Sequence, residues 1–381
     1  MPVYQVNSQG QLLHLGTLIP VRPDGFVMQR SDGTADYTEG LPWWLFDMRP
    51  QGFLGRAYAH RHAQALGLPP NLLEWSDTDA IRALIHHGQD TIGNVLLGDV
   101  ARDRFLALSP APVIPASDKA LSYVRLAQEA VMGEMPGSSA GGEQPKFTAL
   151  TEAPDGVSHV MVKFSLADHN PVTERWRDLL LAEHHALETL REAGLPAAHT
   201  TITDACGQRF LEVARFDRVG KNGRRALLSL AALEAEFVGK APAPWPILVA
   251  ELVEHRIVEA QALPLAQAYY AFGQLIGNTD MHPGNLSFVR DDARLYSLSP
   301  AYDMLPMAFA PRASGALGNH ISAVSLHTSV PHDVWHDMLP IADRLLKRMM
   351  AEPRFSASFS SCFHALGRHL ENAAKVISRV G

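Results

Sequence analysis

Few cysteines, no excess of basic residues and no long apolar run limit what this 381-residue chain can be. Its two cysteines, Cys206 and Cys362, form neither a disulfide framework nor a metal-type spacing, which is typical of a reducing compartment. A net charge of −7 argues against nucleic acid as the main partner. The most apolar stretch, residues 263–276, is too short to span a bilayer, and the first residues lack the basic and apolar regions of a signal peptide. We expect a cytoplasmic protein without a membrane partner.

What is present is enough apolar sequence for two cores or one bilobed enzyme, since 46% of the residues are hydrophobic. Alternating patterns predict short strands, and apolar residues at helical spacing predict helices. Most of the strand signals lie before residue 215, and the segments at 245–277 and 332–378 are mainly helical. We expect strands at 11–19, 25–30, 147–151, 159–164 and 209–214, and helices at 52–66, 77–86, 119–131, 173–193, 245–277 and 332–378. This order predicts an α+β fold, with a β-rich lobe followed by a helical lobe.

A polar loop near residue 280 carries the groups that kinase-type phosphoryl transfer requires. In the segment GNTDMHPGN (277–285), Asp280 stands five residues before Asn285, and Asp303 in SPAYD (299–303) follows eighteen residues after Asn285. A carboxylate must orient the attacking hydroxyl and accept its proton, while an amide oxygen and a second carboxylate hold the metal ions. Magnesium prefers such oxygen ligands. We therefore assign Asp280 as the base and Asn285 and Asp303 as Mg²⁺ ligands.

An ordinary turn is the alternative, because Asp, Asn, Gly and Pro also cluster in turns for local reasons. The context favours the catalytic interpretation. A buried helix is expected at 263–276, and short strands are expected at 286–289 and 294–298, the second of which leads towards Asp303. A helix, a polar loop, a hairpin and then an aspartate would bring the groups together.

A lysine inside an apolar strand supplies a further part of this site. Lys163 lies in HVMVKF (159–164), where an unpaired ammonium would be costly to bury. Glu183 falls on the apolar stripe of the helix expected at 173–193, where a carboxylate also requires compensation. An ion pair between the two would satisfy both and would place the lysine to hold ATP phosphates. The alternatives are an edge-strand lysine and a marginal glutamate, both facing water.

Two other segments are weaker signals for a nucleotide site. The stretch GSSAGGEQPK (137–146) precedes a strand, and its glycines could bring backbone N–H groups close to phosphates, although a flexible linker has the same composition. The strand at 209–214 runs into a polar connector, where a kinase hinge is expected to contact adenine. Phe216 could stack on the base there, or could be a plain core residue. The cluster of apolar residues at 41–46 is interpreted as part of the hydrophobic core.

The chain resembles the HipA family of bacterial toxin kinases, and is similar to its full-length homologues with an extra N-terminal subdomain. The resemblance covers most of the chain and is strongest at 138–147, 215–218, 277–285 and 299–303. It implies a bilobed protein-kinase-like fold and an ATP- and Mg²⁺-dependent serine/threonine kinase, a phosphotransferase of EC class 2.7. It also implies a toxin–antitoxin system with a small helix-turn-helix antitoxin. The protein substrate would be translation-related, as in members that phosphorylate an aminoacyl-tRNA synthetase.

The resemblance also assigns site residues and domains. The catalytic residue would be Asp280 and the metal ligands Asn285 and Asp303, and the ATP-binding residues would be Lys163, Glu183, Glu212, Ala214, Phe216, Ser139, Gly141 and Gly142. Autophosphorylation of Ser138 or Ser139 would disable the enzyme. The domains would be an N-terminal subdomain at 1–115, a kinase-like N-lobe at 116–218 and a helical C-lobe at 219–381. Residue 281 is Met where many relatives have a basic or polar residue, so substrate positioning would differ. No helix-turn-helix pattern is found near the N-terminus, so direct DNA binding is not expected.

Two competing functions follow from the same residues. The sequence around Asp280 also resembles the catalytic loop of aminoglycoside and choline kinases, which would make the protein a small-molecule phosphotransferase. A pseudokinase acting through a partner is the other alternative, and the presence of Lys163, Asp280, Asn285 and Asp303 argues against it.

Overall fold

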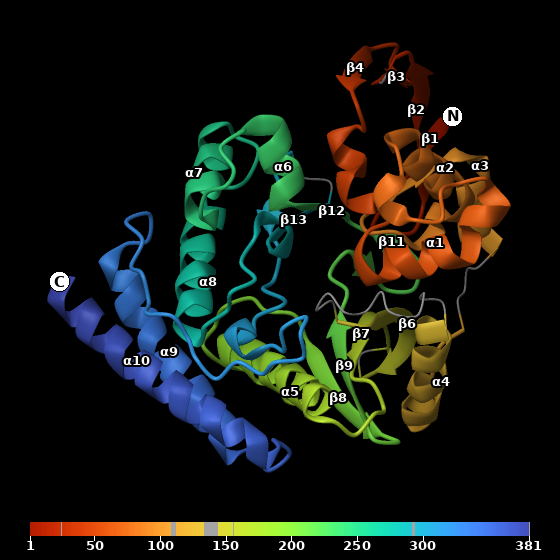
Figure 1. The fold of residues 1–381 in the computed structure, drawn as a ribbon. Helices are drawn as coiled ribbons and strands as arrows, with labels where there is room; N and C mark the ends of the chain where they lie inside the picture. The colour runs from red at the N-terminus through yellow and green to blue at the C-terminus, as the bar shows by residue number, and fades with distance from the viewer. Residues whose placement is uncertain (24, 108–111, 133–143, 155, 292–293, 381) are drawn as a thin grey trace.

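Three parts follow one another along the chain and meet around a central cleft. The computed structural model describes residues 1–23, 25–107, 112–132, 144–154, 156–291 and 294–380. In Figure 1, residues 1–107 lie at the upper right, a sheet built from residues 146–214 lies below them, and the long helices of the last third form the left side. No helix in the described ranges is both long and apolar enough to cross a membrane.

The first part is an antiparallel sheet packed against helices. Its strand order is β4-β3-β2-β1-β5. Val3 and Leu18 of the sheet pack with Ile81 and Leu84 of the second helix, all buried. That helix begins with a capping box, in which Ser76 and Asp79 bond each other's backbone N–H. The elements are β1 (Pro2–Val6), β2 (Leu12–Val21), β3 (Gly25–Arg30), β4 (Ala35–Glu39), η1 (Trp43–Met48), α1 (Gly52–Leu66), η2 (Leu72–Glu74), α2 (Asp77–His87), η3 (Gly88–Asp90), β5 (Val95–Leu97) and α3 (Gly98–Ala107).

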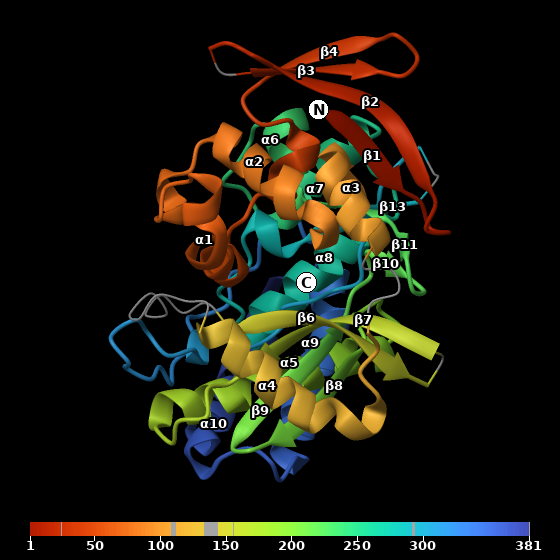
Figure 2. The same cartoon turned by 90° about the vertical axis from the view of Figure 1, so that its right-hand side faces the viewer.

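The second part is a four-stranded antiparallel sheet with one helix on each face. It consists of η4 (Ala116–Asp118), α4 (Lys119–Met132), β6 (Lys146–Ala153), β7 (Gly156–Phe164), α5 (Pro171–Glu192), β8 (Thr200–Ala205) and β9 (Gln208–Ala214), with strand order β6-β7-β9-β8. One face packs Val162 and Phe210 against Tyr123 of α4, and the other packs Leu211 against Leu180 of α5. Figure 2 shows α4 in front of the sheet. Strands β7 and β9 are thus covered on both faces.

The third part is mainly helical and holds the largest core. Phe272 and Leu275, Trp335 and Leu366 belong to one buried cluster, and each such side chain contributes about 1.5–3 kcal/mol by burial. The elements are β10 (Arg218–Val219), β11 (Gly223–Arg224), β12 (Ala226–Ser229), α6 (Leu230–Phe237), α7 (Trp245–Glu254), α8 (Ala262–Ile276), η6 (Pro283–Asn285), β13 (Ser287–Arg290), β14 (Ser297–Leu298), η7 (Met307–Phe309), α9 (His332–Ala351), η8 (Ala357–Phe359) and α10 (Ser360–Val380). Strands β12, β13 and β14 form a small sheet beside the cleft.

Ion pairs attach the first part to the segment that follows β9. Asp217 accepts hydrogen bonds from Arg218 at 2.6 Å, from the N–H of Gly93 at 2.9 Å and from Arg215 at 3.0 Å. Asp90 of the first part binds the same two arginines, at 2.9 Å and 3.1 Å. Burial alone would raise the pKa of Asp217, but the two guanidinium groups outweigh it and lower the pKa to about 2. The segment leading out of β9 is therefore held in a fixed place.

The predicted elements are largely confirmed. Strand β3 and helix α1 begin and end where the sequence places them, and the helix predicted at 173–193 is α5. Asn170 caps α5 by accepting a hydrogen bond from Thr173 N–H at 2.9 Å, so the cap lies before the predicted start. The strand predicted at 294–298 is shorter, because only Ser297 and Leu298 pair with β13.

Candidate active site

A buried ion pair connects the middle of the sheet to helix α5. The Lys163 ammonium lies 2.7 Å and 2.8 Å from the two carboxylate oxygens of Glu183. Lys163 is 7% exposed and Glu183 is 1% exposed. Because α5 covers the same face of the sheet on which Lys163 stands, each charge finds the partner that its burial requires. The predicted pair is present.

The same ammonium also contacts the carboxylate of Asp303, which comes from the loop after β14. Burial alone would lower the pKa of Lys163, but the two carboxylates outweigh it and raise the pKa. Burial raises the pKa of Glu183 to about 7, against the opposing effect of Lys163. Burial would also raise the pKa of Asp303, but Lys163 and then Lys146 outweigh it and lower the pKa. Asp303 therefore stays ionised at neutral pH.

The loop after α8 positions the aspartate and the asparagine. Helix α8 is capped at its C-terminal end by Gly277, which adopts the left-handed conformation with φ of 74°. The Nδ2 of Asn285 donates to the main-chain oxygen of Asp280 at 2.7 Å and to its Oδ2 at 3.2 Å. The Asp280 carboxylate is 51% exposed, so it faces solvent and a substrate can approach it.

Asn278 is a positioning residue that the sequence analysis did not single out. Its buried side chain accepts a hydrogen bond from the N–H of Asp280 at 3.0 Å. Its Nδ2 donates to the main-chain oxygen of Asp303 at 3.2 Å, where the backbone has φ of 53°. One side chain thus fixes the loops that carry both aspartates. The sequence signal for this role is its position two residues before Asp280, because an Asn side chain can accept a hydrogen bond from the backbone N–H two residues later.

Except for Asn278, these groups line a space between the two lobes, called here the interlobe cleft. One section of about 340 Å³ is lined by Lys163, Glu183, Asp280, Asn285 and Asp303, among others. A neighbouring section of about 630 Å³ shares three of these residues and extends to the segment after β9. The combined space is of the size that small-ligand sites use.

The segment after β9 lines the wider section as predicted for a hinge. Ala214 and Phe216 both face this space. The Phe216 ring lies 5.6 Å from the ring of Tyr302, centroid to centroid. Burial raises the pKa of Tyr302, whose hydroxyl is hydrogen-bonded to Ser287 at 2.6 Å. An apolar aromatic wall therefore faces the polar groups across the cleft.

Glu212 does not contribute to the cleft as its assignment to ATP binding required. Neighbouring side chains on a strand point to opposite faces, so Glu212 shares the α4 face with Phe210. Its carboxylate binds the ammonium of Lys119 at 2.9 Å. Its main chain lies between two paired strands, opposite Val162 and Thr201. The structure therefore corrects this assignment.

The four predicted loop positions Ser138, Ser139, Gly141 and Gly142 lie outside the described residues. Lys146, which follows them at the start of β6, lines both sections of the cleft. It stands opposite Lys163 in the β6–β7 ladder, so two cations enter the cleft from adjacent strands. Lys146 is thus a cleft residue that the sequence did not indicate.

The first part of the chain also supplies cleft residues that the sequence did not indicate. Phe46, Asp47 and Gln51 line the wider section. Asp47 accepts hydrogen bonds from Ser229 N–H at 2.6 Å and from its hydroxyl at 2.7 Å, which joins η1 to the start of α6. Phe46 is 42% exposed, so the interpretation of 41–46 as core is wrong for this residue.

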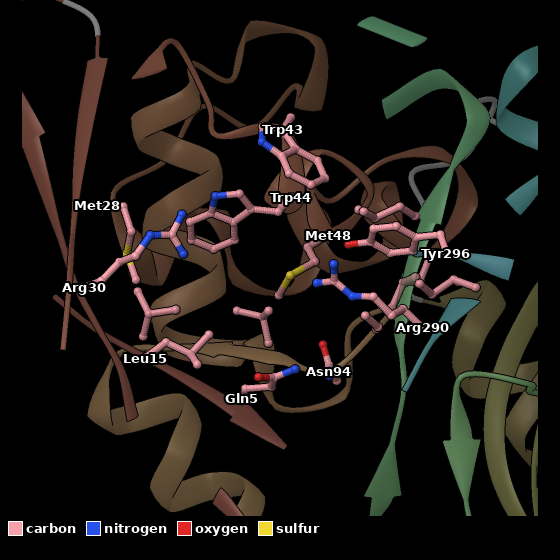
Figure 3. A pocket seen from close by; sticks show the side chains of 17 residues that line it. Gln5, Leu15, Met28, Arg30, Trp43, Trp44, Met48, Asn94, Arg290 and Tyr296 are labelled. Atoms are coloured by element: carbon pink, nitrogen blue, oxygen red, sulfur yellow. The ribbon is translucent and has the colours of Figure 1, made fainter. Parts of the chain in front are cut away.

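A separate cavity of about 310 Å³ lies behind η1, between the first sheet and β12. Figure 3 shows Trp43 and Trp44 on one side of it, with Arg30 and Arg290 at two of its edges. The Arg290 guanidinium lies 4.3 Å from the ring centroid of Tyr296. This cavity contains none of the groups predicted for phosphoryl transfer.

The cleft therefore combines the buried ammonium of Lys163, the ionised carboxylate of Asp303 and the exposed carboxylate of Asp280. It also contains the amide of Asn285 and an aromatic wall. Cations bind phosphate oxygens, and oxygen ligands bind divalent metal ions. An exposed carboxylate next to these groups can accept a proton from a hydroxyl. The residues assigned to catalysis and binding are brought together in this cleft, except for Glu212 and the four loop positions. Their catalytic and binding roles stay predictions.

Comparison with known proteins gives a consistent family. The family described as "HipA-like C-terminal domain" matches residues 138–370, and the family described as "YjjJ-like toxin, middle domain" matches residues 1–106. The Escherichia coli (strain K12) protein named Toxin YjjJ is 35% identical over 383 residues, covering 100% of this chain and 86% of that protein.

Two solved structures are similar to this chain. HipA of Shewanella oneidensis MR-1, in a complex with HipB and operator DNA, matches with a TM-score of 0.66 and 16% identity, covering 98% of this chain and 97% of that chain. The Helicobacter pylori proinflammatory kinase CtkA matches with a TM-score of 0.45 and 14% identity, covering 62% and 94%. The likeness to HipA confirms the predicted α+β, bilobed kinase-like class.

Proposed function

Because this chain belongs to the HipA-like toxin family, on its YjjJ-like branch, we propose that it is an ATP- and Mg²⁺-dependent serine/threonine protein kinase and the toxin of a toxin–antitoxin system. One observation carries the proposal. Lys163 is held by Glu183 and contacts Asp303, and Asp280 and Asn285 line the same cleft. A kinase needs a phosphate-binding lysine, a base and metal ligands at one point.

Each group has a distinct task in the proposed reaction. The Lys163 ammonium binds phosphate oxygens of ATP, and Glu183 keeps that ammonium in place. Phe216 and the backbone at Ala214 contact the adenine. The Asp280 carboxylate orients the substrate hydroxyl and accepts its proton while the hydroxyl oxygen attacks the γ-phosphorus, and the bond from that phosphorus to the bridging oxygen breaks, with ADP as the leaving group.

The residues present fit a magnesium ion. The Nδ2 of Asn285 is bonded to Asp280, so its carboxamide oxygen is the atom left for a metal. The lowered pKa of Asp303 keeps a second oxygen ligand ionised, and hard oxygen ligands are those that Mg²⁺ prefers. Asn285 and Asp303 would hold the ion. When bound, Mg²⁺ would neutralise charge on the phosphates.

Regulation and partners follow from the same family membership. We propose that Ser138 or Ser139 is autophosphorylated, which places a charged phosphate on the loop and disables the enzyme. Ser139, Gly141 and Gly142 would contact the ATP phosphates through their backbone N–H groups. The S. oneidensis HipA structure contains HipB and operator DNA, which supports a small helix-turn-helix antitoxin as a partner here. The substrate would be a translation-related protein.

Incubation of the purified chain with γ-labelled ATP, Mg²⁺ and a cell lysate tests the proposal. Label on one protein band, absent with the Asp280→Ala variant and dependent on Mg²⁺, is the expected result. Phosphoamino-acid analysis of that band should give phosphoserine or phosphothreonine. Label found only in the small-molecule fraction would instead identify a small-molecule phosphotransferase, and no label with no affinity for ATP–Mg²⁺ by calorimetry would leave a pseudokinase.

A further inference from the structure

A second polar cavity lies beside strands β6 and β7, apart from the interlobe cleft. It has a volume of about 380 Å³ and is bordered by α3, α4, the β6–β7 hairpin and the loop between β10 and β11. Figures 1 and 2 both place β11 between the helices of the first part and strands β6 and β7. Among the described residues, it shares no lining side chain with either section of the cleft.

The charges at the edge of this cavity do not balance. Arg215 and Arg218 are matched by Asp90 and Asp217, each carboxylate binding both guanidinium groups. Arg224 adds a third guanidinium, and it forms no salt bridge with a carboxylate of the described chain. The cluster thus has one positive charge more than it has negative charges.

Arg224 is buried, and one of its N–H donor groups has no hydrogen-bond acceptor in the described structure. The residue is 5% exposed and lines the cavity, and its Nη1 is buried without a hydrogen-bond partner in the described structure. Its Nη2 donates to the main-chain oxygen of Gln89, and its guanidinium lies 4.7 Å from the ring centroid of Phe105. Burial and then the charge of Arg218 lower the pKa of Arg224 to about 9. An uncompensated buried cation is costly, and an anion beside it would remove that cost.

Other donors stand around the same space. Lys221 and Asn222 precede Arg224 in the β10–β11 loop and line the cavity. The Nε2 of His159 is hydrogen-bonded to the main-chain oxygen of Lys221 at 2.9 Å, which holds the loop against β7. Asp90 also borders the cavity, but two arginines already neutralise its charge.

The side of the cavity formed by α4 and β6 is largely apolar, although Arg125, which pairs with Glu129 at 2.7 Å, also lines it. Ile114, Leu126 and Leu150 line it, coming from the segment before α4, from α4 and from β6. We propose that this cavity is a binding site for a small phosphate monoester. Its phosphate pairs with Arg224 and Lys221, and its organic part lies against Ile114 and Leu126. A dianion suits the site because Arg224 and Lys221 both line it, and charge-assisted hydrogen bonds to phosphate oxygens are strong.

Phenyl phosphate is a suitable probe, with inorganic phosphate and benzoate as comparisons at constant ionic strength. Isothermal titration calorimetry on the full chain should give tighter binding for phenyl phosphate than for either comparison. Arg224→Gln and Lys221→Gln should each weaken it by about tenfold or more, because each removes a charge-assisted hydrogen bond. Arg225→Gln is the matched control, since Arg225 is the next residue but pairs with Asp291 at 3.0 Å.

The variants separate this site from the interlobe cleft. Phosphate bound in the cleft would be insensitive to Lys221→Gln, so unchanged affinity in that variant overturns the proposal. An equal loss in Arg225→Gln, or benzoate binding as tightly as phenyl phosphate, also overturns it, as does no binding at millimolar concentration. If Arg224→Gln fails to fold, as judged by its thermal melt, Lys221→Gln decides, because Lys221 is exposed and its loss leaves the buried cluster intact.

Discussion

Replacement of Asp280 by alanine separates the proposed base from the groups that bind ATP. The carboxylate is 51% exposed, and the Asn285 side chain keeps its shorter bond, 2.7 Å, to the main-chain oxygen of residue 280. Asn278 also keeps its bond to the N–H at 280, because residue 280 contributes only its backbone to that bond. The loop should therefore hold its shape, and the free energy of unfolding should change by less than about 1 kcal/mol.

The effect on catalysis should be much larger. A positioned general base contributes about 10²–10⁴-fold to a rate, so phosphate transfer should fall by that factor. Lys163, Asn285 and Asp303 are untouched by the change, so the affinity for ATP–Mg²⁺ should stay within about threefold. The loss should thus lie in kcat and not in nucleotide binding.

Labelled-ATP transfer and calorimetry measure the two quantities on the same protein. Asp280→Asn is an isosteric variant that should lose transfer as well, since an amide cannot accept the proton. Asp291→Asn is the matched control, because Asp291 is an exposed carboxylate that pairs with Arg225 outside the cleft. Persistent turnover together with lost nucleotide affinity in Asp280→Ala would refute the assignment of base and binding roles.

Three other predictions concern the metal, the ion cluster and the loop. Asp303→Ala should weaken nucleotide binding only when Mg²⁺ is present, and a normal Mg²⁺ dependence by calorimetry would contradict this. The pKa of Asp217 is about 2 in the folded protein, below the usual value near 4 for an unfolded chain. Its contribution to the free energy of unfolding is therefore present above pH 4 and is lost as the pH falls towards 2. Denaturant unfolding should show a loss of about 2–3 kcal/mol over that range, which Asp217→Asn should lack, and an unchanged slope would contradict the ion pairing. Phosphate on Ser138 or Ser139 should appear by mass spectrometry in the wild type and be absent from Asp280→Ala, whereas equal occupancy would argue against autophosphorylation.

The parts of the site that were predictable from sequence contain charged side chains that are costly to bury without a partner. A lysine within an apolar strand and a glutamate on an apolar helix stripe each require a partner, which is why the pair of Lys163 and Glu183 could be expected. The Asp280 to Asn285 loop was recognisable because its spacing is short and a helix and a strand flank it.

The errors have a different physical origin. All but the last residue of β9 are buried, so no polar alternation shows which face Glu212 takes, and it faces α4. Phe46 and Asp47 line the cleft only because residues 43–48 pack beside α6, more than 180 residues later. Such long-range packing leaves no local pattern in the sequence.

The most direct test of the central claim is a crystal structure of the chain with Mg²⁺ and a non-hydrolysable ATP analogue. The account predicts the adenine near Phe216, phosphate oxygens at the Lys163 ammonium, and the metal ion between Asn285 and Asp303. Nucleotide bound elsewhere, or a metal ion held without either of these two residues, would contradict it.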